Sequence, residues 1–393
     1  MGVGFDGPAR PLFRITMWTG LVTLFTLGLY RFWMKTRVRR WLWSSFRPGG
    51  QPLEYTGDPT EKMMGFLAAM VVIALYVGVV NLILVYFGLT LFQNTGPAYV
   101  VSGGGLIMLF FFAKYRARRY KLTRTAWRGV TFGLDKGALA YARKATVWWA
   151  FAVLSAGLLM PVTVFVLERF LTDRTRFGDG HLRQSGSVAM LYPAAVPLAV
   201  GVLVAAAAAT TVIFGHRVAG TVIGVAAAAV LAYGLVHFQV TALARLTEAK
   251  SLGSLGFRFD PSPIRVFLLM ARGYALALIV VFPPAVAFTT AIVALQSGPR
   301  LIQIGEKLGV DLSTLAGLPP YVLALACVPL YFAIFLLWSA LRATFVTRPI
   351  YHHYAERLQL TGTSELARLK QTPRAAPEEA EGFADALDIG ASF

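Results

Sequence analysis

Long apolar runs alternate with short basic segments along almost the whole chain. An α-helix needs about 20 apolar residues, within a range of roughly 17 to 25, to cross the hydrocarbon core of a bilayer. Eight runs reach this length: 12–34, 64–92, 98–114, 140–167, 187–214, 217–243, 266–296 and 319–341. The pattern predicts an all-α membrane protein, a polytopic bundle of about eight hydrophobic segments.

The segments between the runs differ in charge. Six of the runs form pairs joined by short or nearly neutral links, at 91–98, 214–218 and 296–318. Segments 31–47 and 114–128 instead hold six and seven basic residues, respectively, and no acidic residue. Because positive charge next to membrane spans is retained in the cytoplasm, we expect both basic segments to lie there.

The basic segments belong to a repeated pattern. Arg37-Val-Arg39-Arg40-Trp41 matches Arg116-Ala-Arg118-Arg119-Tyr120 without a gap, and a patch of alternating polar and apolar residues follows each. Five such helix–strand modules lie at 31–57, 114–133, 168–178, 244–260 and 341–362. Isolated strands would leave unpaired backbone groups, so we predict that the patches pair into a small sheet on the cytoplasmic face.

The modules define one membrane domain, 1–362, followed by a tail. From Gln371 onward the tail has five acidic residues against Arg374 and two prolines, which predicts a disordered segment over 363–393.

The run 140–167 leaves two topologies open. If it crosses the membrane, the last three modules lie on the opposite side from the first two. Gly157 and Pro161 could instead break it into a re-entrant hairpin, which keeps all modules on one side. The charge of the loops favours the one-sided arrangement, and the same choice between crossing and re-entering applies to 12–34.

Composition supports a membrane protein over a soluble basic one. The chain is 56% hydrophobic and 14% charged, whereas soluble proteins carry about 25% charged residues. The net charge is +18, but the basic residues gather at the ends of apolar runs, which argues against nucleic-acid binding. A single cysteine, Cys327, excludes an intrachain disulfide.

Several motifs resemble one known family. They are Thr26-Leu-Gly-Leu-Tyr-Arg-Phe-Trp-Met-Lys-Thr-Arg-Val-Arg-Arg-Trp41 with Leu53-Glu-Tyr-Thr-Gly57, Tyr115–Thr125 with Gly129–Phe132, and Thr175–Asp179. Together they resemble the YjgN-like family of bacterial inner-membrane proteins, over roughly residues 12 to 350. The resemblance implies a multi-pass protein of the inner (cytoplasmic) membrane and carries over no functional residue.

The arginine clusters are candidate sites for lipid head groups. Each basic residue near an anionic leaflet contributes about 1 kcal/mol, so a group of three could bind anionic phospholipid. Such charges also serve as plain topology signals, which requires no specific lipid. The six candidate residues are Arg37, Arg39, Arg40, Arg116, Arg118 and Arg119.

A transport pathway would need polar groups inside the membrane, and three residues qualify: Asn81, His237 and Gln239. A bridging hydrogen bond between helices is the alternative for His237. No acidic residue lies centrally in any run, which argues against a carboxylate proton relay. A second hint is given by prolines within or at the ends of runs, which could interrupt helices as in transporters: Pro161, Pro193, Pro197, Pro283, Pro284 and Pro329. The alternative, which we favour, is that proline is more frequent in membrane helices generally.

Other motifs predict packing rather than chemistry. Gly220, Gly224, Ala228 and Ala232 recur every four residues and would let a second helix approach closely. His353 and Glu356 could place two metal ligands on one helical face, but we expect a solvated surface helix there because further ligands are missing. With no catalytic triad and no metal or cofactor motif, we expect no enzyme. Two hypotheses remain: a transporter or channel for a small or amphiphilic solute, and a non-transporting scaffold that binds anionic lipid or partner proteins.

Overall fold

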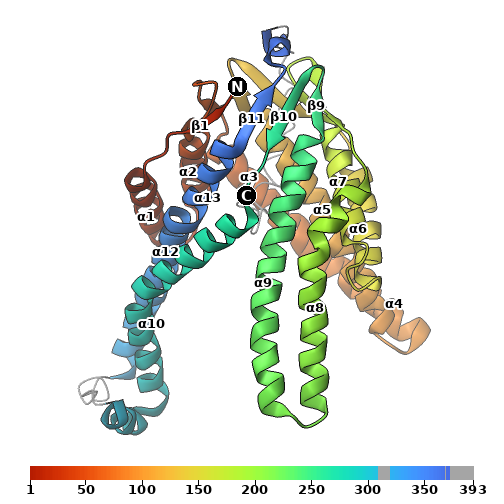
Figure 1. The fold of residues 1–393 in the computed structure, drawn as a ribbon. Coiled ribbons are helices and arrows are strands. Elements are labelled where there is room, and N and C mark those ends of the chain that lie inside the picture. The colour runs from red at the N-terminus through yellow and green to blue at the C-terminus, as the bar shows by residue number, and fades with distance from the viewer. Residues whose placement is uncertain (309–318, 368, 372–393) are drawn as a thin grey trace. The chain divides into compact units, whose positions relative to one another are not determined.

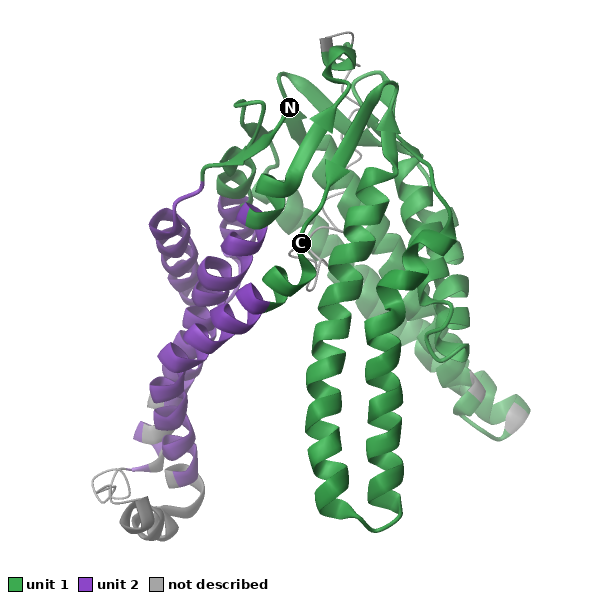
Figure 2. Ribbon diagram, viewed as in Figure 1, with its two compact units in different colours: residues 1–6, 39–267, 353–393 green, residues 7–38, 268–352 purple. Residues whose placement is uncertain are grey.

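The computed structural model describes residues 1–308, 319–367 and 369–371, and it is mostly helical with small sheets (Figure 1). The chain divides into two compact units. Unit 1 comprises Met1–Asp6, Arg39–Phe267 and His353–Phe393, and unit 2 comprises Gly7–Val38 and Leu268–His352 (Figure 2).

Six helices of the described chain are long and apolar enough to cross a membrane. They are Pro59–Leu91, Ala98–Thr123, Val188–Ile213, Arg217–Glu248, Pro263–Val293 and Cys327–Arg357. Each coincides with one of the eight runs predicted from the sequence.

The remaining two runs are each split into two shorter helices, so six of the eight predicted segments form single helices long enough to cross a membrane. Run 12–34 forms α1 (Ala9–Phe25) and α2 (Arg31–Ser45), and run 140–167 forms α6 (Ala138–Leu154) and α7 (Met160–Thr172). The breaks come from consecutive residues with positive φ, Leu27 and Gly28 in the first run and Ala156 and Gly157 in the second. Positive φ cannot continue a right-handed helix.

Unit 1 contains two long helix pairs. The first pairs α5 (Gly96–Thr123) with a continuous helix made of α3 (Pro59–Leu75), the π-helical turn η1 (Tyr76–Val80) and α4 (Asn81–Phe92). Asp58 caps the start of α3 by accepting a hydrogen bond from the backbone N–H of Thr60.

The second pair, α8 (Tyr192–Ile213) and α9 (Arg217–Glu248), packs through small residues at heptad spacing. The buried small residues are Ala194, Gly201 and Ala208 on α8, and Gly220, Ala227 and Gly234 on α9. A seven-residue repeat keeps one seam of a helix facing its partner. The predicted four-residue stripe is therefore only partly used, because Ala228 and Ala232 are exposed.

All strands of unit 1 pair antiparallel and follow one another in chain order. β1 (Val3–Phe5) pairs with β2 (Phe46–Pro48). One five-stranded sheet joins β3 (Leu53–Tyr55), β4 (Thr125–Trp127), β5 (Val130–Leu134), β6 (Thr175–Phe177) and β7 (Gly180–His181). A four-stranded sheet joins β8 (Arg183–Gln184), β9 (Lys250–Leu252), β10 (Leu255–Phe259) and β11 (Leu358–Thr361). All five predicted patches form paired strands, but in two sheets rather than one: three lie in the five-stranded sheet, as β3, β5 and β6, and two in the four-stranded sheet, as β10 and β11.

The N-terminus returns to the last strand. The Met1 amino group donates a 2.6 Å hydrogen bond to the Leu360 carbonyl, the Leu360 N–H donates to the Met1 carbonyl at 2.8 Å, and Gly2 bridges to Gln359. Since β2 contacts β3 and β7 leads directly into β8, the strands β1–β11 form a closed order of neighbours, here called the strand ring. One apolar cluster lies within it, with Trp127, Phe177, Leu252, Leu255 and Leu360 buried.

The start of the predicted disordered tail is ordered on the strand ring. The backbone N–H of Lys370 donates to the Asp179 carboxylate, and the Gln371 side chain bonds Thr131 through both its oxygen and its nitrogen. Leu366 and Leu369 pack against the apolar cluster of the ring. The boundary at 363 is thus corrected, and the prediction for 368 and 372–393 lies outside the described residues.

Unit 2 contains α1, the first half of α2, most of α10 (Pro263–Leu308), α12 (Pro320–Leu341), the π-helical turn η3 (Arg342–Thr347) and most of α13 (Arg348–Arg357). Its core includes buried Ala277, Val281 and Leu341. The Arg348 Nε donates a 2.6 Å hydrogen bond to the Gly7 carbonyl, which ties the start of α13 to the chain just before α1.

The prolines do not interrupt the long helices, so the transport hint drawn from them finds no support in the structure. Helix α8 continues through Pro197, α10 through Pro283 and Pro284, and α12 through Pro329. Pro193 and Pro161 lie in the first turns of α8 and α7, where the missing N–H is tolerated.

Candidate functional site

Four polar side chains, in the last turns of α5 and at the residue that follows it, bond to other elements of unit 1. Tyr115 bonds to the chain just after β5, Arg118 bonds to Glu168 of α7, and Tyr120 and Arg124 both bond to Glu61 of α3. The Tyr115 hydroxyl donates a 2.5 Å bond to the Asp135 carbonyl, at the end of β5. We call this set the arginine–tyrosine layer.

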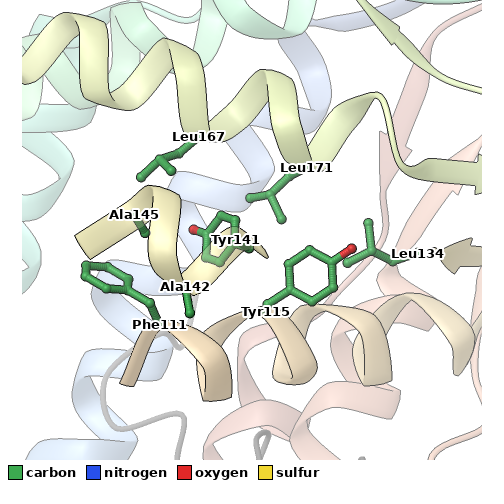
Figure 3. Close-up of a cluster of buried hydrophobic side chains, with 8 residues drawn as sticks. All are labelled: Phe111, Tyr115, Leu134, Tyr141, Ala142, Ala145, Leu167 and Leu171. Atoms are coloured by element: carbon green, nitrogen blue, oxygen red, sulfur yellow. The ribbon is translucent and has the colours of Figure 1, made fainter. Parts of the chain in front are cut away.

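An apolar cluster supports the layer where α5, α6 and α7 meet. Tyr115 and Phe111 of α5 pack with Tyr141 of α6 and Leu167 of α7, and Figure 3 shows these side chains pointing toward one another. Ala142 and Ala145 are fully buried, which lets α6 lie close to α5. Arg118 and Glu168 are on the same helices, one residue or a few residues from members of this cluster.

Glu168 of α7 receives two basic side chains. Arg118 donates to both carboxylate oxygens at 3.2 Å, and the Lys250 ammonium lies 2.7 Å from Oε1. Burial by itself would raise the pKa of Glu168, but the Arg118 and Lys250 charges outweigh this effect and lower it to about 2. One charged carboxylate therefore joins α5, α7 and β9.

A second cluster surrounds Lys62 of α3. Its side chain is fully buried, with the ammonium 4.9 Å from the centre of the Tyr55 ring and 5.6 Å from that of Tyr120. Beside it, Arg124 donates to both oxygens of Glu61 at 2.7 and 2.8 Å, and the Tyr120 hydroxyl donates to Glu61 at 3.0 Å. The contacts of the cations with aromatic faces and with the Glu61 carboxylate offset the free-energy cost of burying these charged groups.

Three of the six predicted head-group arginines donate hydrogen bonds to protein groups as follows. Arg39 donates to the Tyr55 hydroxyl at 3.1 Å, Arg40 to the Gly57 carbonyl at 3.1 Å, and Arg118 to Glu168. Arg116 lies over the Phe112 ring, and Arg119 is half-buried on the same helix.

Arg37 belongs to unit 2, where it is exposed and its guanidinium lies over the Tyr30 ring at 5.7 Å. Sequence reasoning did not identify Lys62, Glu61, Tyr55 or Lys250. Among the residues of these two clusters, only Glu168 stood out in the sequence, because it is the one acidic residue at the end of its apolar run.

The three predicted intramembrane polar residues have different surroundings. His237 donates one hydrogen bond through Nδ1 to the Ala194 carbonyl of α8 at 3.1 Å, so the bridging interpretation is confirmed. Gln239, two residues later on α9, is exposed. Asn81 follows the π-helical turn η1, and its buried Oδ1 has no hydrogen-bond partner among the described residues.

His353 is not on a solvated surface, contrary to the expectation. It is 3% exposed, and its Nε2 accepts a 3.1 Å hydrogen bond from the backbone N–H of Ser262. The described part of the chain brings together no group of three or more histidine, cysteine or acidic residues that could hold a metal ion.

Comparison with known proteins identifies a family. A bacterial family of unknown function, DUF898, matches residues 1–385. No curated protein and no solved structure matches the chain. The match confirms the resemblance noted for the arginine-rich motifs. The chain therefore belongs to the DUF898 family of bacterial proteins of unknown function.

Proposed function

We propose that the chain is a multi-pass protein of the bacterial inner membrane, with the strand ring at the cytoplasmic interface. Large apolar side chains point outward from its long helices, such as Leu203 on α8 (70% exposed) and Val218 on α9 (81% exposed). Soluble proteins rarely expose continuous apolar surface of this kind.

The distribution of charge supports the same placement. In unit 1, every charged residue of a helix except Arg217 lies in the part of that helix next to a strand. The ring end is thus polar and basic, while the helices beyond it are apolar. Excess positive charge next to membrane spans favours the cytoplasmic side.

For the activity, we infer a non-enzymatic scaffold that binds anionic phospholipid around the strand ring. The observation that carries this proposal is a set of exposed basic residues in or near the strands, comprising Arg128, Arg143, Lys144 and Arg258. Arg128 lies over the Trp127 ring and Lys144 over the Phe170 ring, which holds both cations near the apolar surface. An anionic leaflet attracts each such residue by about 1 kcal/mol.

Lipid binding in nanodiscs tests the scaffold. The double variant Arg143→Gln/Lys144→Gln should bind phosphatidylglycerol about 30-fold more weakly, from two residues at about 1 kcal/mol each. Arg217→Gln is the matched control, because Arg217 lies at the opposite end of α9. Equal loss in both variants, or equal affinity for phosphatidylcholine, would contradict the proposal.

Transport of a small or amphiphilic solute is the second candidate, and Asn81 is the observation that favours it. A buried amide oxygen without a partner, next to a π-helical turn, is a feature found at functional positions in helices. If Asn81 contacts a solute, an Asn81→Leu strain should reproduce the metabolite profile of a deletion strain while the protein stays folded. A normal profile with raised thermal stability would identify a packing defect instead.

A further inference from the structure

The α6–α7 pair folds back on itself. The Thr163 hydroxyl of α7 donates a 3.0 Å hydrogen bond to the Trp148 carbonyl of α6, fifteen residues earlier. The strands on either side of the pair are also neighbours, since β5 and β6 pair through Phe132–Phe177 and Leu134–Thr175. Both ends of the helix pair therefore leave from the same place on the strand ring.

The turn at the tip satisfies its own backbone. The N–H groups of Ser155, Ala156, Gly157, Leu158 and Met160 donate to carbonyls within the turn and the end of α6. The remaining N–H, that of Leu159, donates to the Ser155 hydroxyl at 3.0 Å. In hydrocarbon an unsatisfied backbone group costs several kcal/mol, so a turn of this kind is suited to a medium without water.

The tip is apolar and unusually exposed. Val153 is 74% exposed, Leu154 81% and Leu158 73%. In water these side chains would form an uncovered apolar surface, and no polar side chain other than the hydroxyl of Ser155 lies between 153 and 160. The exposed side chains fit lipid acyl chains.

The distance from the charged base to the tip matches half a bilayer. Lys144 is exposed on α6 and Arg169 on α7, and each lies ten residues from the turn, at Leu154 and Leu159. At 1.5 Å per residue, ten helical residues span about 15 Å. The hydrocarbon core is about 30 Å thick, so charges held at the interface place the tip near its middle.

From these observations we propose that α6–α7 is a re-entrant hairpin, which enters the leaflet next to the strand ring, turns near the bilayer midplane and returns. Its partner is the acyl-chain layer of that leaflet. The proposal rests on the membrane location proposed above and adds that β5, β6 and the strands after them stay on one side.

The related turn between α1 and α2 shows why the inference is limited to α6–α7. Leu27 and Gly28 repeat the positive φ values, and the Thr26 hydroxyl accepts from the Tyr30 N–H as the Ser155 hydroxyl does from Leu159. However, Arg31 follows this turn immediately and is exposed. A charge at that position holds the turn close to the interface.

Single cysteines in a Cys327→Ala background test the proposal in membrane vesicles of both orientations. We expect Leu158→Cys to resist a membrane-impermeant maleimide from either side and to react only in detergent. A spin label at that position should report a depth near the midplane. Leu154→Cys serves as a second tip variant in case the first does not fold.

Two outcomes would overturn the re-entrant hairpin. Labelling of Leu158→Cys from the ring side would place the tip in water, and labelling from the far side would show that the pair crosses. Leu203→Cys on α8 is the control that separates this proposal from the membrane location itself. If Leu203→Cys is also labelled without detergent, the membrane proposal fails; if it is protected, only the hairpin fails.

Discussion

At the scale of single residues, Glu168 shows how unit 1 keeps buried charge in balance. One carboxylate receives the bidentate guanidinium of Arg118 and the ammonium of Lys250. If the carboxylate is removed, the two cations lose their counter-charge. The resulting loss of stability is larger than the net stabilisation that the intact ion pairs provide. The main role of the Glu168 carboxylate is therefore to neutralise two basic side chains that are removed from water on folding.

Replacing Glu168 should lower stability strongly. We expect Glu168→Gln to decrease the free energy of unfolding by about 3 kcal/mol, measured by denaturant unfolding in detergent. Glu248→Gln is the matched control, since Glu248 faces Arg245 at 4.0 Å on the exposed surface and should change stability by less than about 0.5 kcal/mol. Equal effects in the two variants would contradict the role assigned to Glu168.

The lowered pKa of Glu168 also predicts how the stability of the protein depends on pH. The folded-state pKa of Glu168 is about 2, below its ordinary value of 4.5. A group with a lowered pKa stabilises the fold above its unfolded-state pKa and loses this effect as the pH falls through the folded-state value. Between pH 4.5 and 2 the wild type should therefore lose more stability than Glu168→Gln.

Sequence reasoning identified the residue types of this region but not their partners. The arginine clusters were found from their spacing, and His237 was assigned a bridging bond that the structure confirms. The pairing of Arg118 with Glu168 depends on α5 lying next to α7, fifty residues later. Lys250 reaches the same carboxylate from a strand, and no local pattern contains that information.

At the scale of elements, the contact between α8 and α9 depends on small residues at heptad positions. A Cβ placed on Gly234 would lie 2.7 Å from the Cα of Leu198, whereas a Cβ on Gly224 would lie 4.0 Å from the Ala208 Cβ. The two glycines are on the same helix but have different neighbours. They offer a direct comparison.

Gly234→Ala should push the two helices apart and destabilise the pair by about 1 to 3 kcal/mol. Gly224→Ala should be neutral or stabilising by up to about 1 kcal/mol, because alanine favours the helix and meets only ordinary contact. Thermal loss of helicity in detergent distinguishes them. If Gly224→Ala lowers the thermal stability more than Gly234→Ala does, the helices pack through the predicted four-residue stripe instead.

The positions of the long helices were predicted more accurately than the points at which two of the apolar runs break. Apolar length located all six long helices, because a membrane span is a property of local composition. Prolines were considered as possible break points, but α8 and α12 continue through Pro197 and Pro329. The actual breaks are at Gly28 and Gly157, where positive φ and a capping hydroxyl occur together. Gly157 was recognised from the sequence as one possible break, but Gly28 was not singled out.

At the scale of the whole ring, closure depends on the first residues of the chain. Predicting the five strand patches required only alternation, but β1 has the short sequence Val3-Gly4-Phe5 and gives no such signal. Its two neighbours, β2 and β11, are separated by about three hundred residues. Closure is therefore a long-range property that a single sequence does not reveal.

A disulfide tests ring closure. In a Cys327→Ala background, Gly2→Cys/Gln359→Cys should cross-link under mild oxidation, because the two residues form a bridge between neighbouring strands. Gly4→Cys/Gln359→Cys, two residues out of register, should cross-link much more slowly. After cleavage between the two positions, non-reducing electrophoresis shows whether the fragments stay joined. No difference between the pairs would argue against the closure.

The order of the strands also determines the order in which the protein can be completed during synthesis. β1 can pair with β2 after fewer than fifty residues, but its other edge stays open until β11 emerges from the ribosome, some three hundred residues later. An open strand edge invites wrong pairing with other chains. We therefore expect truncated or slowly translated chains to aggregate through the free edge of β1, even when their helices are already inserted.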